Sequence, residues 1–124
     1  MSEHLQKGKH GEDLAQKHLL FEGYVILERN WRYKNLEIDF IATDKNTLVV
    51  VEVKTRSTAI YGEPEDFVTK SKQKKLIRAI NKYVKQTKCD KEIRFDIVSV
   101  IENNETSKVS LIRDAFYALV AGRR

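Results

Sequence analysis

The stretch LVVVEVKTR, residues 48–56, places a carboxylate and an ammonium in an otherwise apolar strand. Side chains alternate between the two faces of a strand, so Glu52 and Lys54 share one face while the intervening valines line the other. Charges are unusual on a face that begins with Leu48 and Val50. The pattern predicts that the valine face packs into the core and that the charged face carries chemistry.

The preceding strand also mixes apolar and acidic residues. In the stretch EIDFIA, residues 37–42, alternation places Asp39 and Ile41 on one face and Ile38 and Phe40 on the other. We therefore expect a second acid beside the core on this strand.

The turn DKN, residues 44–46, joins these two strands and predicts a hairpin. Counted from Lys45, Asp39 lies six residues earlier and Glu52 lies seven residues later. An antiparallel hairpin with a one-residue bulge or offset would hold the two carboxylates almost opposite each other.

Two adjacent carboxylates repel each other unless a positive group neutralises them, and a divalent cation is the usual partner. Mg²⁺, or Mn²⁺ in its place, prefers oxygen ligands such as those of Asp39, Glu52 and the backbone carbonyl of Val53. Such an ion offsets charge on a phosphodiester and activates a water. Lys54 could orient that water or stabilise the developing charge. These residues together predict metal-dependent phosphodiester hydrolysis.

A structural interpretation of the same residues competes with this one. Charged residues are common near strand ends, and Glu52 and Lys54 could form a solvent-exposed pair that contributes almost nothing to stability. The spacing alone leaves both interpretations open.

A basic helix is expected next to this strand pair. Residues 69–89 contain eight basic residues and no acidic one. Lys74, Arg78 and Lys82 lie on one side of the predicted helix and are candidates for contacts with nucleic-acid phosphates. Arg56, at the end of the strand, could reach a phosphate, and Tyr61, in the loop 56–68, could contact a base.

The composition indicates a small water-soluble domain. The chain has 124 residues, which favours one domain over residues 1–124 with an ordered core of about residues 11–120. Its net charge of +5 favours an anionic partner. No apolar run is long enough to cross a membrane, so no membrane partner is expected. The single cysteine and the absence of a signal-like N-terminus predict a cytoplasmic location.

The elements that must position these residues follow from periodicity and turn signals. Three helices are predicted at residues 11–22, 71–87 and 114–120, and five strands at 24–33, 37–43, 47–55, 92–101 and 108–112. The order αβββαββα indicates an α/β fold with a mixed central sheet flanked by helices.

The blocks GEDLAQKHLLFEGYVILERNWRYKNLEIDFIA, LVVVEVKTR, YGEPEDFVTKSKQKKL and RFDIVSV resemble the YraN family of small bacterial proteins. That family is similar to Holliday junction resolvases and to the PD-(D/E)XK nucleases with their restriction-endonuclease-like fold. The resemblance implies that Asp39, Glu52 and Lys54 form the nuclease core, with Glu12 as a further acid and Gln73 beside the site. It also implies DNA as the partner and a two-fold homodimer.

Two positions depart from the pattern. Leu36 stands where the family has glycine before its Glu-Ile-Asp block, and Ile38 replaces the superfamily's proline before the aspartate. Neither change removes a ligand. The leading hypothesis is a metal-dependent endonuclease acting on DNA, and the alternative is a non-catalytic module that binds nucleic acid on a nuclease scaffold.

Overall fold

The computed structural model describes residues 3–58 and 68–116. Its elements follow the order αβββαββ. They are α1 (Glu3–Phe21), β1 (Val25–Tyr33), β2 (Leu36–Asp44), β3 (Thr47–Arg56), α2 (Lys70–Thr87), β4 (Glu92–Glu102) and β5 (Ser107–Ile112). The predicted α/β architecture, a mixed sheet flanked by helices as in nuclease-like folds, is confirmed.

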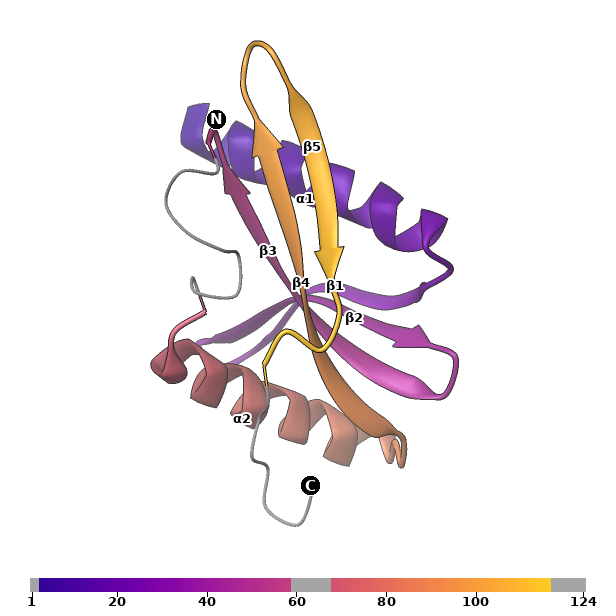
Figure 1. Ribbon diagram of the computed structural model, residues 1–124. Helices are drawn as coiled ribbons and strands as arrows, with labels where there is room; N and C mark the ends of the chain where they lie inside the picture. Colours follow the sequence, from indigo (N-terminus) through magenta and orange to yellow (C-terminus); the bar gives the residue numbers. More distant parts are fainter. Residues whose placement is uncertain (1–2, 59–67, 117–124) are drawn as a thin grey trace.

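The five strands form one sheet in the order β1-β2-β3-β4-β5. The first three strands are an antiparallel meander, as predicted from their short turns. Helix α2 connects β3 to β4, which run parallel, and β5 pairs antiparallel with β4. The sheet is strongly twisted. In Figure 1, β1 and β2 therefore run roughly horizontally, whereas β4 and β5 run nearly vertically.

One helix covers each face of the sheet (Figure 1). The α1-side core consists of Ala15, Leu19, Tyr24, Phe40, Ala42, Val49, Val51, Val98 and Val100. The α2-side core consists of Leu36, Ile38, Ile41, Leu48, Val50, Val68, Leu76, Ala79, Ile80, Tyr83, Phe95 and Ile97. The alternation predicted for β3 is confirmed, since Val49 and Val51 face α1 while Leu48 and Val50 face α2.

Helix α1 begins eight residues earlier than predicted, at Glu3 rather than Gly11. The first half of this helix is polar, so it lacks the apolar periodicity that marks a helix in sequence. Gly11 lies inside the helix, where a Cβ would overlap Thr55 Oγ1 of β3. The glycine thus serves close packing of helix on strand. Within the described ranges, neither helix has the length and apolar character needed to cross a membrane.

The helix predicted at residues 114–120 does not begin at Asp114. Asp114 has a φ of 53°, a left-handed conformation that does not begin a right-handed helix. Its N–H donates to Asp96 Oδ1 at 2.9 Å, and the Ala115 N–H donates to the Phe95 carbonyl at 2.8 Å. Residues 117–120 lie outside the described residues.

Strands β1 and β2 exchange faces part-way along their length, against simple alternation. Ile38 and Ile41 belong to the α2-side core, whereas Phe40 between them belongs to the α1-side core. The prediction that Ile38 and Phe40 share a face was therefore wrong. The β1–β2 register shifts between Ile26 and Glu28. Asn30, which has a φ of 54°, lies further along β1, facing Asp39 between two paired positions of the ladder. Alternation presumes extended backbone throughout, and this pair of residues interrupts it.

Candidate metal and catalytic site

The carboxyl groups of Asp39 and Glu52 meet where the β2–β3 ladder ends. The ladder is regular from Asp44 opposite Thr47 to Phe40 opposite Val51, so the next residues on each strand are the two acids. The predicted bulge is absent because the turn has two residues, 45 and 46, and its centre is equally far from both acids. The proximity predicted from the hairpin is thus achieved with regular pairing.

Each carboxyl group is held by a specific contact. The Val53 N–H donates to Asp39 Oδ2 at 2.8 Å, so this side chain occupies the place that a backbone carbonyl takes in a continuing ladder. The Asp39 carboxyl also forms a hydrogen bond with the carboxyl group of Glu52. Two carboxyl groups can share a hydrogen bond only when one of them is protonated.

The site shifts the ionisation of Asp39. Burial, followed by the hydrogen bond and charge of Glu52, raises the pKa of Asp39 from 3.8 to about 8, against the opposing effects of the Val53 N–H and Lys72. Glu52 is only 5% exposed, and within residues 3–58 and 68–116 its Oε2 atom has no hydrogen-bond partner. The pair therefore holds one proton near neutral pH and leaves a buried oxygen available to a cation.

Lys72 forms an ion pair with this oxygen. Its Nζ lies 3.5 Å from Glu52 Oε2, and its side chain is 40% exposed. Lys72 lies in the first turn of α2, which Thr69 caps by accepting a hydrogen bond from the Lys72 N–H at 3.1 Å. The contact was not predicted from the sequence. Its only signal was the run of lysines at the start of the helix, which does not single out Lys72.

The other residues predicted on β3 lie beyond the carboxyl pair. Lys54 is partly buried, pairs with Ser99 of β4 in the ladder, and has no ion pair within the described chain. Arg56 is partly buried at the end of the strand. The Val53 N–H is engaged by Asp39, and a role for the Val53 carbonyl as a metal ligand stays a prediction.

Glu12 lies on α1, beside the point where Asn30 interrupts β1. Its Oε1 accepts hydrogen bonds from Asn30 Nδ2 at 3.1 Å and from Arg29 Nη2 at 3.4 Å. Over residues 3–58 and 68–116, no three acidic, histidine or cysteine side chains are grouped so that they could hold a metal ion. Glu12 is therefore linked to the site through Asn30, opposite Asp39, and not as a third member of the carboxyl cluster.

Gln73 has a local contact. Its Nε2 donates to the Val68 carbonyl at 3.0 Å, which fastens the start of α2 to the segment before it. This hydrogen bond does not test a role of Gln73 at the site. Tyr61, predicted to contact substrate, lies outside the described residues.

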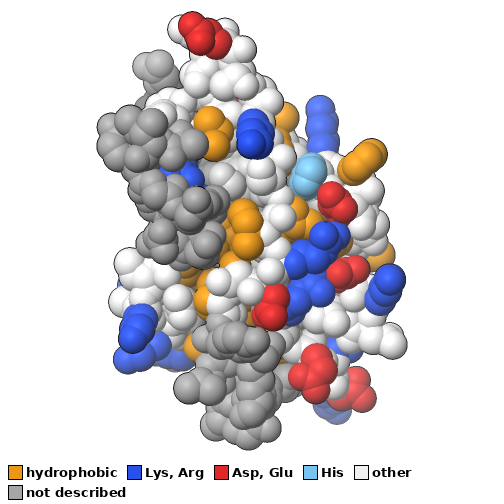
Figure 2. All heavy atoms as spheres, viewed as in Figure 1, with side chains coloured by type: hydrophobic (Ala, Val, Ile, Leu, Met, Phe, Trp, Pro, Cys, Tyr) orange, Lys and Arg blue, Asp and Glu red, His pale blue; other side chains and the backbone are white. Residues whose placement is uncertain are grey.

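The predicted basic surface lies on α2. Lys74 and Arg78 are exposed, and Lys82 is partly buried with its Nζ 4.9 Å from the centre of the Tyr33 ring. Figure 2 shows a group of basic side chains at the lower left, where Figure 1 places the start of α2. A positive surface thus begins beside the carboxyl pair.

Comparison with known proteins places this arrangement in a family. The model of "Uncharacterised protein family UPF0102" matches residues 11–100. The chain belongs to the UPF0102 family. UPF0102 is the YraN family, so the resemblance noted from the sequence is confirmed.

Three UPF0102 relatives illustrate the similarity. The UPF0102 protein of Flavobacterium johnsoniae is 50% identical over 121 residues, which cover 94% of this chain and 98% of that protein. Those of Christiangramia forsetii and Bacteroides thetaiotaomicron are 46% and 43% identical, over 94% of this chain and 98% and 97% of their own lengths. Glu12, Asp39, Glu52, Lys54 and Gln73 all lie within the segment that the UPF0102 model matches.

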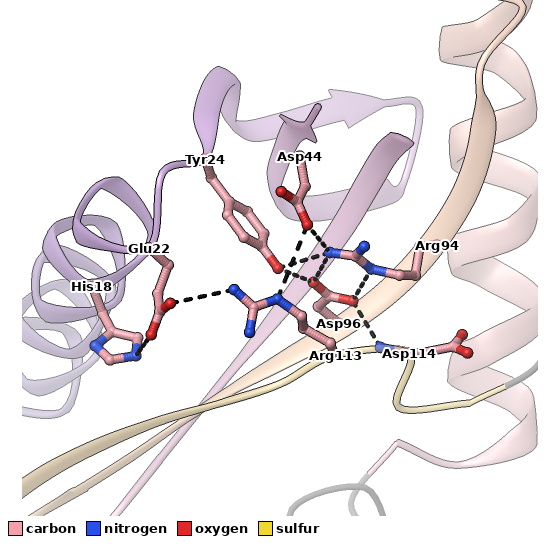
Figure 3. A network of polar contacts seen from close by, with 8 residues as sticks. All are labelled: His18, Glu22, Tyr24, Asp44, Arg94, Asp96, Arg113 and Asp114. Atoms are coloured by element: carbon pink, nitrogen blue, oxygen red, sulfur yellow. Dashed lines mark hydrogen bonds and ion pairs between the residues drawn. The ribbon is translucent and has the colours of Figure 1, made fainter. Parts of the chain in front are cut away.

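A second polar cluster, centred on β4 where Arg94 and Asp96 pair with Val49 and Val51 of β3, was not anticipated from the sequence (Figure 3). Asp96 is 1% exposed and accepts hydrogen bonds from Tyr24 at 2.6 Å and from Arg94 Nε at 2.9 Å. Arg94 also donates to Asp44 at 2.9 Å, and Arg113 bonds Glu22 at 3.3 Å. An acid within the apolar strand β4 was its signal, as it was for Glu52 on β3.

Acids and arginines of opposite charge contact each other in this cluster of the UPF0102 chain. The hydrogen bonds to Asp96 and Asp44, with the charge of Asp96, raise the pKa of Arg94 against the opposing effect of burial. Burial, followed by the hydrogen bond and charge of Asp96, raises the pKa of Tyr24. Figure 2 shows acidic and basic side chains intermingled beside a histidine on the right of the view. The cluster ties β4 to the start of β1 and the end of β2, which is a structural role.

Proposed function

We propose that this protein is a metal-dependent endonuclease-like enzyme that hydrolyses phosphodiester bonds in DNA. The observation that carries the proposal is the Asp39–Glu52 pair, in which a half-buried and a buried carboxyl group meet and Glu52 Oε2 has no hydrogen-bond partner among the described residues. Keeping two acids together raises the pKa of one of them and costs stability, which active sites commonly tolerate.

The donor set fits a small divalent cation. Asp39 and Glu52 offer hard oxygen ligands, and Mg²⁺ commonly uses only one or two carboxylates together with waters and a phosphate. When bound, Mg²⁺ or Mn²⁺ would supply positive charge for the phosphate oxygens and acidify a nearby water. Asp39 would release its proton on binding, because the cation replaces the proton as the partner of the pair.

The neighbouring ammonium groups have complementary tasks. Lys54, on the same face as Glu52, would orient the attacking water or stabilise developing charge. Lys72, now 3.5 Å from Glu52, would move to a substrate phosphate once a cation neutralises the acid. Lys74, Arg78 and Lys82 continue this positive surface along α2, and Arg56 lies at the end of β3.

Calorimetric titration of Mn²⁺ and Mg²⁺ into the wild type and Asp39→Asn tests the metal site. We expect binding by the wild type, its loss in Asp39→Asn, and retention in the control Asp90→Asn, which changes an exposed aspartate after α2. Cleavage of duplex, single-stranded, flap and four-way DNA follows with the same variants. Undiminished metal-dependent cleavage by Asp39→Asn would reject the assignment.

A binding module without catalysis is the second candidate. It is favoured by Glu12, whose carboxylate is occupied by Arg29 and Asn30 so that the acid pair lacks a third ligand among the described residues. This candidate predicts salt-dependent DNA binding in EDTA and no cleavage with any cation.

The oligomeric state remains a prediction from the resolvase resemblance. A two-fold dimer would hold two sites at a fixed spacing and cut paired strands. Sedimentation of the protein as a monomer at working concentration would reject it.

A further inference from the structure

An open hollow of about 330 Å³ lies between α2 and the β1–β2 turn. Its lining includes Tyr33, Leu36, Arg78, Asn81, Lys82 and Lys85. Among the described residues, the lining contains an aromatic ring, an amide and three cations, and no acid. It belongs to neither the carboxyl pair nor the Tyr24–Asp96 cluster.

Two ammonium groups lie close to the Tyr33 ring. Lys82 Nζ is 4.9 Å from the ring centre and Lys34 Nζ is 5.4 Å from it. The neighbouring Trp31 packs edge-on against Tyr83 at 5.3 Å, which fixes β1 against α2 beneath the hollow. Tyr33 itself packs against the α2-side core while remaining partly exposed, so the ring is held in place and part of it stays open to solvent.

The cations of the hollow are not neutralised. Within residues 3–58 and 68–116, Arg78, Lys82 and Lys85 form no ion pair. Three uncompensated cations around a fixed ring match a ligand that combines phosphate groups with an aromatic face.

We propose that this hollow binds an unpaired nucleotide of a nucleic-acid strand. The base stacks on Tyr33 against Leu36, the Asn81 amide contacts the base edge, and Arg78, Lys82 and Lys85 hold the flanking phosphates. A duplex keeps its bases stacked inside, so only an unpaired base can reach the ring. The inference deepens the proposed function and rests on its nucleic-acid substrate.

The hollow also has a fixed relation to the carboxyl pair. Lys72 contacts Glu52 from the first turn of α2, and Lys82 lies ten residues further along the same helix, or about 15 Å. A strand following the basic side of α2 from the acids would reach the hollow within a few nucleotides. The substrate class is therefore DNA with an unpaired segment beside the cleaved bond.

Binding of a fluorescein-labelled single strand, measured by anisotropy in EDTA, tests this site without requiring catalysis. We expect Tyr33→Leu to weaken binding about tenfold and Tyr33→Trp to restore it, because stacking requires only an aromatic face. An abasic strand should bind the wild type about as weakly as the intact strand binds Tyr33→Leu. Lys82→Gln should lower the salt slope by about 0.7, the value for one phosphate contact on a single strand.

Lys108→Gln serves as the matched control, since it removes an exposed cation on β5, at the other edge of the sheet. Unchanged affinity in Tyr33→Leu, or equal wild-type affinity for abasic and intact strands, would overturn the proposal, even if Asp39-dependent cleavage is observed. Tyr33-dependent binding without cleavage in any cation would support the hollow and reject the nuclease.

Discussion

Asn30 lies opposite Asp39 at the point where β1 and β2 exchange the faces that their side chains cover. The Asn30 amide donates to Glu12 of α1 at 3.1 Å, while the Asp39 carboxyl accepts from the Val53 N–H of β3 at 2.8 Å. The interruption of β1 and β2 at these two residues thus connects α1, on one face of the sheet, with the carboxyl pair.

The left-handed backbone at Asn30 gives the first prediction. Asn30→Ala should lower the free energy of unfolding by about 1–2 kcal/mol, because a Cβ makes this conformation unfavourable and alanine cannot stabilise it locally. Asn30→Gly should lose less, since glycine accepts a φ of 54°. Urea unfolding measures both, and an alanine variant as stable as the glycine variant would contradict the conformation.

Asp39 gives a prediction for pH. Its pKa is about 8 in the folded chain against 3.8 ordinarily, so the folded state binds the extra proton between these values. The stabilising contribution is fully present below about pH 4 and is lost as the pH rises to about 8. In EDTA, wild-type stability should therefore fall by about 1 kcal/mol per pH unit within this window.

Asp39→Asn should flatten that slope, because an amide does not titrate, and it should be the more stable protein near the upper end of the window. Urea unfolding at several pH values compares it with the wild type and with Asp90→Asn, which should retain the slope. A wild type whose stability rises over the same range would show that the carboxyl pair is not protonated.

Gly11 gives a packing prediction. Gly11→Ala should destabilise the fold by about 1–3 kcal/mol, because its Cβ overlaps Thr55 Oγ1. Alanine is otherwise the better helix former by about 1 kcal/mol, so the sign of the effect identifies the clash. Thr55→Ala should restore part of the loss in the double variant. Additive effects in this thermal or urea cycle would refute direct contact.

Arg94 gives a prediction for the buried polar cluster. Arg94→Met should cost about 3–5 kcal/mol, because it leaves the Asp96 carboxylate buried without its cation. Tyr24→Phe removes one hydrogen bond to the same carboxylate and should cost about 1–2 kcal/mol. Denaturant unfolding distinguishes the two, and similar losses in both variants would contradict the central position of Arg94.

Several features could be predicted from residues that are neighbours in the chain. The valines of β3 and the length of α2 follow from periodicity, and the hairpin places Asp39 beside Glu52 through a short turn. Local geometry suffices there because each partner lies within a few residues of a turn or a helical repeat.

The start of α1 and the face exchange could not be predicted in this way. Gly11 resembles a helix boundary until its contact with Thr55 is known, and Asn30 resembles an ordinary strand residue until its φ is known. Both conformations are set by packing against elements far along the chain.

The sequence by itself determined which strands form the sheet and that two acids meet where the β2–β3 ladder ends. Only the tertiary structure decided that Lys72 is the cation beside Glu52, that Arg29 and Asn30 hold Glu12, and which residues surround Tyr33. The reason is physical: periodicity and turns act between near neighbours, whereas each of these contacts depends on how a helix docks on a twisted sheet.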